Sequence, residues 1–260
     1  MRTLKLTIAY DGTRYAGWQV QRRSRGRGAR GAGPPTIQGT LEGVLQRILQ
    51  ERVRVIGSGR TDAGVHALAQ VAHVRIRSGM SKARLLAAMN HLLPRDIAVT
   101  AIEEPGGAFH AQFSATRKRY RYRIVTRPVV LPFIRPYVHQ VRAPLNVPLM
   151  RRELWALAGR HDFRAFARAK SVRGRSTTRA ITAARLMRQD GELILELAGN
   201  GFLHTMVRSI TGTLIDVGRG RLPPGTMRRL LRTKDRLQVG ITAPARGLTL
   251  VSVGYGRRHG

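Results

Sequence analysis

The chain contains no cysteine, which excludes disulfide bonds, iron–sulfur clusters and zinc sites built on thiolates. It also lacks any apolar run that approaches the roughly 20 residues of a membrane-spanning helix. Its first residues, MRTLKLTIAYDG, enter an alternating strand pattern directly, without the apolar core of a signal peptide. These absences predict a soluble, cytoplasmic protein without a membrane partner.

Acidic side chains are also scarce. The chain has 14 aspartates and glutamates against 47 lysines and arginines, which gives a formal net charge of +33. Such a charge costs stability through self-repulsion unless a polyanion neutralises it. Most of the basic residues are arginines, whose planar guanidinium groups bind phosphate and stack on bases. We therefore expect a nucleic-acid partner, and the absence of a helix-turn-helix or zinc-finger pattern disfavours DNA.

Hydrophobic spacing predicts the order β-α-β-β-α-β twice along the chain. The first half contains predicted strands over Lys5–Tyr10, Arg52–Ile56, Gln70–Arg77 and Ile97–Glu103, and predicted helices over Ile37–Gln50 and Ser81–Leu92. The second half contains predicted strands over Arg117–Thr126, Ala180–Met187, Leu193–Leu197 and Leu248–Val253, and predicted helices over Val147–Ala158, Leu203–Val217 and Thr226–Arg232.

This order is typical of the ferredoxin-like fold, which includes the RNA-recognition sheet. We therefore predict an α+β protein of two fused ferredoxin-like (RRM-like) halves, residues 1–105 and 106–260. Their sheets should be mixed and mainly antiparallel, with a central active-site cleft. Residues 22–35, RRSRGRGARGAGPP, belong to neither half and are too polar to form a core. This basic insertion could follow phosphates, or it could be a tolerated surface loop.

The glycine spacing of residues 59–64 fits a phosphate-binding P-loop, but Val65 and His66 stand where that loop needs lysine and then serine or threonine. The eight histidines form no HExxH or comparable pair. We therefore predict neither a metal site nor a small-molecule cofactor.

Within the same stretch, GSGRTDAG, one aspartate stands out. Gly57, Gly59 and Gly64 allow backbone angles that would place Asp62 at the tip of a tight bend between two strands. An aspartate in this setting can simply bond to its own turn. Alternatively, the neighbouring Arg60 would lower the pKa of the Asp62 carboxyl by about 1–3 units, which suits a nucleophile, a weak base or a stabiliser of positive charge. The spacing alone leaves both interpretations open.

The residues around Asp62 resemble the signature of the TruA-type tRNA pseudouridine synthases, and further segments agree in the same order. The matching segments are YDGT from Tyr10, YAGWQ from Tyr15, GRTDAGVH from Gly59, FHAQFSAT from Phe109, RYRY from Arg119, HDF from His161, NGFLHTMVR from Asn200 and GL from Gly247. The resemblance covers nearly the whole chain.

This resemblance implies an isomerase that converts uridine to pseudouridine, chiefly at positions 38, 39 and 40 of the tRNA anticodon stem-loop. It also implies a homodimer that needs no cofactor.

The resemblance assigns Asp62 as the catalytic aspartate and Arg208 as the arginine that pairs with it. Tyr120 resembles a tyrosine that stacks on the target base, Leu248 resembles the apolar floor of the site, and Arg60 resembles an arginine that holds the flipped nucleotide. By pattern alone, Arg208 would lie on a solvated helix face and Leu248 in the core. Tyr120 fits either an aromatic RNA-binding face, with the alternating arginines on the other face, or the edge of a core.

Two further segments resemble tRNA contacts: Phe109, His110, Ala111, Gln112 and Phe113, and the basic stretch Ser171, Val172, Arg173, Gly174 and Arg175. The competing hypothesis is a non-catalytic basic RNA-binding protein, which would not need Asp62.

Overall fold

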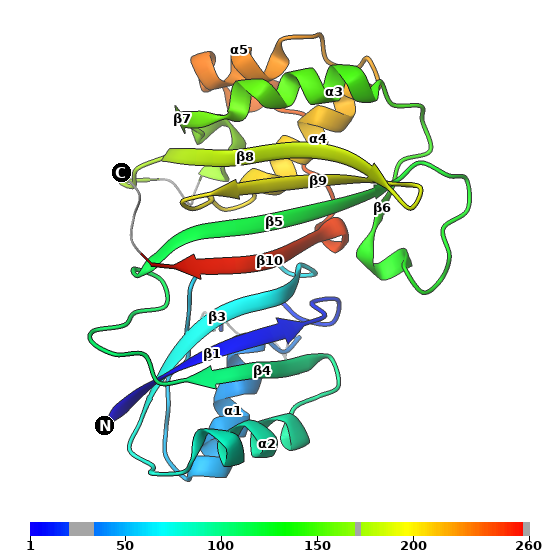
Figure 1. Ribbon diagram of the computed structural model, residues 1–260. Helices are drawn as coiled ribbons and strands as arrows, with labels where there is room; N and C mark the ends of the chain where they lie inside the picture. The colour runs from blue at the N-terminus through cyan, green and yellow to red at the C-terminus, as the bar shows by residue number, and fades with distance from the viewer. Residues whose placement is uncertain (21–33, 170–172, 257–260) are drawn as a thin grey trace, which may run out of the picture. The chain divides into compact units, whose positions relative to one another are not determined.

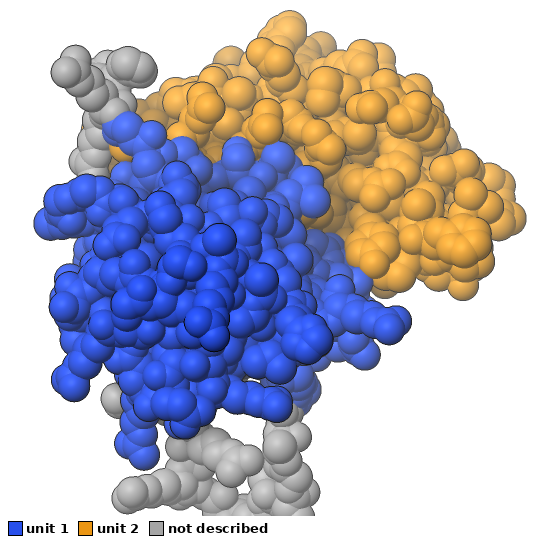
Figure 2. Space-filling view, turned by 60° about the horizontal axis from the view of Figure 1, so that its bottom comes forward, with its two compact units in different colours: residues 1–115, 250–260 blue, residues 116–249 orange. Residues whose placement is uncertain are grey.

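The computed structural model describes residues 1–20, 34–169 and 173–256 of the chain. The chain divides into two compact units, coloured separately in Figure 2: unit 1 is residues 1–115 with 250–260, and unit 2 is residues 116–249. The boundary on the C-terminal side falls inside strand β10 (Leu248–Tyr255).

Unit 1 follows the predicted order β-α-β-β-α-β (Figure 1). Its elements are β1 (Arg2–Tyr10), α1 (Ile37–Leu49), β2 (Ile56–Gly57), β3 (His66–Ile76), α2 (Lys82–Leu92) and β4 (Ile97–Glu103). Its strands lie in the order β4-β1-β3-β10, with β2 also paired to β3. The pairings of β1 with β3, β1 with β4 and β2 with β3 are antiparallel.

The core of unit 1 lies between this sheet and its two helices, which pack against each other. Alternate side chains of β1 are buried, as the period of a strand requires, and α1 buries Leu41 and Leu45 on one face. Thr36 begins α1 by accepting a hydrogen bond from Gly39 N through its side-chain oxygen. Helix α2 ends before Pro94, whose ring disfavours helical geometry in the residue before it.

The strand predicted over Arg52–Ile56 is wrong except at its last residue. Residues 52–55 alternate in exposure as a strand would. However, Val55 N donates to the carboxylate of Glu42 in α1, at 2.9 Å, rather than to a neighbouring strand. Pairing with β3 begins only at Ile56.

In unit 2, the strands β5, β9, β8 and β7 lie side by side and antiparallel, and β6 pairs in parallel with β5. Its elements are β5 (Ala115–Val125), β6 (His139–Gln140), α3 (Val147–Leu154), β7 (Gly159–Asp162), β8 (Thr178–Gln189), β9 (Glu192–Gly199), α4 (Met206–Gly218) and α5 (Thr226–Thr233). Helix α3 packs against β8, α4 and α5. The α+β class and the mainly antiparallel pairing are confirmed. The short strands β6 and β7 were not predicted.

Helix α4 begins at Met206, three residues later than predicted, because Thr205 has a left-handed φ of 65° that cannot continue a helix. The helix is buried on nearly every side rather than on one apolar arc. Two of its buried hydroxyls are satisfied within the helix: Thr211 donates to Val207 O and Thr213 donates to Ser209 O.

Within the described ranges, no helix is both long enough and apolar enough to span a bilayer.

Candidate functional site

Asp62 lies in a tight turn between β2 and β3, as predicted. Val65 N donates to Asp62 O at 3.2 Å, and Gly64 supplies the left-handed φ of 77°. Asp62 is partly exposed, while Thr61 beside it is buried. Of the three glycines in the prediction, only Gly64 has a positive φ. Gly57 is needed for space instead, because a Cβ there would lie 2.6 Å from the Trp18 ring.

A second segment, residues 10–18, supports this turn through two close backbone contacts. A Cβ on Gly12 would lie 2.1 Å from Val65 O, and one on Gly17 would lie 2.6 Å from Thr61 O. Gly17 also has a φ of 92°, which other residues rarely adopt. The glycines of the YDGT and YAGWQ motifs therefore let the segment lie directly against the turn that carries Asp62. The sequence contained this signal, but no role was predicted for these glycines.

Buried hydrogen bonds fix the turn on both sides of Asp62. Tyr10 and Thr61 share a hydrogen bond of 2.8 Å between their hydroxyl oxygens, and Trp18 N donates to Thr61 O at 3.1 Å. Burial raises the pKa of Tyr10 to about 12, so its phenol stays protonated at neutral pH. Ser58 donates to the side-chain oxygen of Gln70 at 2.7 Å. Such satisfied buried networks hold a backbone rigidly. The arrangement holds one partly exposed aspartate on a fixed turn.

Arg60, two residues before Asp62, is exposed at the surface of unit 1.

The predicted tRNA contact Phe109–Phe113 forms an aromatic cluster on unit 1. His110 stacks on Phe113, with ring centres 4.3 Å apart, and Phe113 is 71% exposed. Ala111 N donates to Nδ1 of the buried His73 at 3.1 Å, and the hydroxyl of Tyr255 donates to Ala111 O at 2.8 Å. Burial lowers the pKa of His73 to about 4, so its ring is neutral and can accept this bond. The cluster therefore exposes the Phe113 ring, which stacks on His110. Gln112 is exposed beside it.

In unit 2, Tyr120 lies on β5 with the alternation that was predicted: Tyr120 and Tyr122 are buried, and the arginines between and beside them face the other side. Tyr120 contacts Phe202 edge to face, with ring centres 5.1 Å apart. Tyr120 is therefore largely covered, in part by Phe202.

Two of the alternating arginines of β5 form ion pairs with glutamates of the neighbouring strand. Arg121 pairs with Glu196 on the facing strand at 2.8 Å, and Arg123 makes two hydrogen bonds of 2.7 Å to the carboxylate of Glu192. These ion pairs join neighbouring strands of the sheet, and the glutamates already neutralise the two arginines.

Arg208 is half-buried, so the interpretation as a solvated arginine is wrong. Its Nε donates to Ala243 O at 2.8 Å, and Ala243 N donates back to Arg208 O at 3.1 Å. This contact belongs to an extended segment, residues 239–244, that lies against α4. A Cβ on Gly212 would lie 1.6 Å from Ile241 O, and Asp216 accepts a bond from Ile241 N at 3.1 Å. The segment thereby fixes the orientation of the Arg208 side chain.

The same segment leads to Leu248, which is buried. Tyr122 donates through its hydroxyl to Pro244 O at 2.8 Å. A Cβ on Gly247 would lie 2.6 Å from the Tyr122 ring, so only glycine allows this approach. Leu248 thus follows a tightly held chain, consistent with either an apolar floor or a core position.

The second predicted tRNA-contact segment is described only in part. Ser171 and Val172 lie outside the described residues, while Arg173, Gly174 and Arg175 are exposed. The basic insertion also lies outside the described residues, apart from Pro34 and Pro35.

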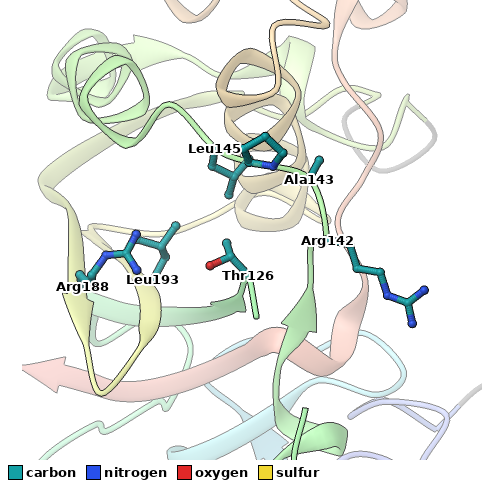
Figure 3. Close-up of a pocket in the computed structure, with 7 residues that line it drawn as sticks. Thr126, Arg142, Ala143, Leu145, Arg188 and Leu193 are labelled. Atoms are coloured by element: carbon teal, nitrogen blue, oxygen red, sulfur yellow. The ribbon is translucent and has the colours of Figure 1, made fainter. Parts of the chain in front are cut away.

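A pocket of about 360 Å³ in unit 2 contains none of the predicted site residues (Figure 3). Its lining includes Thr126, Leu145, Leu193 and two arginines, Arg142 and Arg188. The guanidinium of Arg142 points away from Thr126, so the two arginines do not converge on one anion. In the part of the chain that the structure describes, no three histidine, aspartate or glutamate side chains are arranged to hold a metal ion.

The structure thus places the predicted site residues in two sets, Asp62 and Arg60 in unit 1, and Tyr120, Arg208 and Leu248 in unit 2.

Comparison with known proteins identifies the chemistry. A sequence model of the family described as tRNA pseudouridine synthase matches residues 6–114 and 155–256. The chain is 43% identical over 256 residues to tRNA pseudouridine synthase A of an Exiguobacterium species, covering 98% of both proteins. It is 42% identical over 255 residues to the protein of that name from Pelobacter propionicus, covering 98% of this chain and 100% of the relative. The resemblance found in the sequence is confirmed, and the chain belongs to the tRNA pseudouridine synthase family.

Proposed function

We propose that Asp62 is the catalytic carboxylate of this enzyme, an isomerase that converts uridine to pseudouridine in tRNA. The observation that carries the proposal is the turn itself. Buried hydrogen bonds and glycine contacts on both sides fix the backbone of Asp62, while the residue remains partly exposed. An aspartate that only stabilised its own turn would not need a second segment packed against it.

The isomerisation breaks the bond between N1 of the base and C1′ of the ribose. It then joins C5 of the same base to C1′; the hydrogen of C5 leaves as a proton and N1 takes up a proton, so the product is an isomer of the substrate. Positive charge develops at the sugar when the base departs, and an ionised carboxylate stabilises or captures it. The same carboxylate can accept a proton. No net oxidation or hydrolysis occurs, so the reaction requires no redox partner and no added water.

We propose that Tyr120 stacks on the target base, that Arg208 keeps Asp62 ionised and that Leu248 supplies an apolar floor. A base inside a helix must first be flipped out, at a cost of a few kcal/mol, and Arg60 holds the flipped nucleotide. The contacts of Arg208 with residues 239–244 support its role, because they fix the orientation of its cationic side chain. The other tRNA contacts are Phe109–Phe113 and 171–175.

We further propose that residues 1–105 and 106–260 are two ferredoxin-like halves around a central active-site cleft. In support, unit 1 has the β-α-β-β-α-β order and the antiparallel pairing of that fold. We propose the anticodon stem-loop, at positions 38, 39 and 40, as the target and a homodimer as the working form, without a cofactor. The enzyme would act in the cytoplasm, where tRNA is found.

The test is incubation with an unmodified tRNA transcript, followed by chemical mapping of pseudouridine. The wild-type protein should modify positions 38–40 only, and Asp62→Asn should modify none while binding the tRNA with similar affinity. A wild-type protein that binds tRNA but forms no pseudouridine would instead favour the non-catalytic RNA-binding hypothesis. Modification at other positions would refute the proposed target.

A further inference from the structure

One exposed aromatic residue of unit 2 plays no part in the proposed reaction. Helix α3 passes into a 3₁₀ turn, Trp155–Leu157, in which Leu157 is fully buried but Trp155 is 75% exposed. The indole lines a groove of about 430 Å³ together with His161 of β7 and with Arg228, Leu231 and Arg232 of α5. We call these five residues the Trp155 groove. Both β7 and α5 are labelled in Figure 1.

The two arginines of the groove lie on one face of α5. They are four residues apart, so their Cβ atoms are about 5–6 Å from each other. Met227 and Leu230 are fully buried and hold the opposite face of the helix in the core. Among the described residues, no carboxylate pairs with Arg228 or Arg232, so both charges are available to a ligand.

A buried carboxylate makes the groove rigid. Glu153, in the last turn of α3, accepts hydrogen bonds from Gly225 N at 2.5 Å and from Met227 N at 2.9 Å. These are backbone groups at the start of α5, where the helix dipole favours a negative charge. Glu153 therefore ties α5 to the turn that carries Trp155, and the indole and the arginines keep a fixed spacing. A ligand would not have to order the groove on binding.

From this arrangement we infer that the Trp155 groove is an additional RNA-binding site, which holds an unpaired nucleotide. The base would stack on the Trp155 indole, and the flanking phosphates would bind Arg228 and Arg232. Stacking platforms flanked by cations are how proteins bind single-stranded nucleic acid without reading its sequence. Arginine suits this task because its planar group binds phosphate oxygens in pairs. The inference goes beyond the proposed catalysis and does not depend on Asp62.

An acidic protein segment is the competing occupant, because it would also meet the two cations. RNA is favoured because the flat indole face lies exposed beside them, and because the family acts on an RNA.

Intrinsic fluorescence tests the inference directly. The chain has two tryptophans, and Trp18 is only 1% exposed, so no base can stack on it. A 12-nucleotide oligouridylate should quench the emission of the wild-type protein. The same titration of Trp155→Phe should leave the emission unchanged. An RNA duplex of equal length and poly-glutamate should both quench far less than the single strand.

Substitution of the arginines gives a second readout. Each phosphate contact on a single strand contributes about 0.7 to the slope of log K against log salt concentration. With K taken from the quenching titration, the double variant Arg228→Ala/Arg232→Ala should therefore lower the magnitude of this salt slope by about 1.4. The matched control, Arg52→Ala/Arg54→Ala, removes two exposed arginines of unit 1 and should keep the wild-type slope.

Three results would overturn the inference. The first is equal quenching in the wild-type protein and Trp155→Phe. The second is an unchanged salt slope in the α5 double variant. The third is quenching by poly-glutamate at least as strong as that by RNA, which would identify an acidic protein partner instead. None of these results would affect the proposed role of Asp62, because isomerisation is measured separately.

Discussion

Removal of one hydroxyl, in the substitution Tyr10→Phe, tests whether the turn that carries Asp62 must be held rigidly. The Tyr10 hydroxyl lies 2.8 Å from the Thr61 hydroxyl, and both residues are buried. Without it, the Thr61 hydroxyl loses its partner in an interior that admits little water. Leaving a buried polar group unsatisfied costs about 1–3 kcal/mol of stability. Thr61 precedes Asp62 directly, so part of this cost can be relieved by a shift of the turn.

A displacement of about 1 Å at a catalytic group can lower the rate by about 100-fold. We therefore expect Tyr10→Phe to lower kcat for pseudouridine formation on the order of 10- to 100-fold, with little change in KM for tRNA. The assay is steady-state kinetics on an unmodified tRNA transcript, with the free energy of unfolding measured in parallel.

The matched control is Tyr15→Phe. Tyr15 is as buried as Tyr10, and its hydroxyl donates to Asp96 at 2.6 Å, away from the Asp62 turn. This variant should lose a similar free energy of unfolding but keep the wild-type kcat. Equal loss of kcat in the two variants would refute the reasoning, because it would trace the effect to general destabilisation.

Three further substitutions probe the site. Gly17→Ala places a Cβ 2.6 Å from Thr61 O in the turn that carries Asp62, and should abolish most activity. The control, Gly43→Ala, has open space around the new Cβ in α1. It should stay active and be up to about 1 kcal/mol more stable in chemical denaturation. Because the folded pKa of His73 is about 4 and its ordinary value is 6.5, the unfolded chain binds the proton first as pH falls. The contribution of the neutral His73 ring to the free energy of unfolding is therefore complete above pH 6.5 and is lost by pH 4, about 3 kcal/mol in all. Urea unfolding of His73→Gln should lack this pH dependence. Arg208→Lys keeps the charge but changes the donor that binds Ala243 O, and should lower kcat at least 10-fold at unchanged net charge.

Local patterns predicted the elements of the fold well, because their signals are short in range. The alternation of β1 and the threonine and serine caps of α1 and α2 are visible in the sequence and present in the structure. The strand predicted over Arg52–Ile56 failed for a tertiary reason. Its pattern was correct, but a glutamate from α1 took the backbone donor that a neighbouring strand would have used.

The sequence motif predicted the position of Asp62, but it did not predict the contacts that hold the Asp62 turn in place. Spacing placed Asp62 on a turn, yet it could not show that Gly12 and Gly17, some 50 residues earlier, lie against that turn. Long-range contacts of this kind leave no period in the sequence. The same holds for Arg208, which a helical wheel assigns to solvent. It is half-buried because a later extended segment covers α4.

The measurement closest to the central claim is single-turnover release of tritium from tRNA that carries [5-³H]uridine, with enzyme in excess. Formation of the new carbon–carbon bond at C5 frees this hydrogen, so release reports the isomerisation itself. We predict no release by Asp62→Asn at enzyme concentrations that saturate tRNA binding. The control Asp162→Asn changes a carboxylate that bonds Thr177 in unit 2, and should release tritium at nearly the wild-type rate. Release by Asp62→Asn at the wild-type rate would contradict the account.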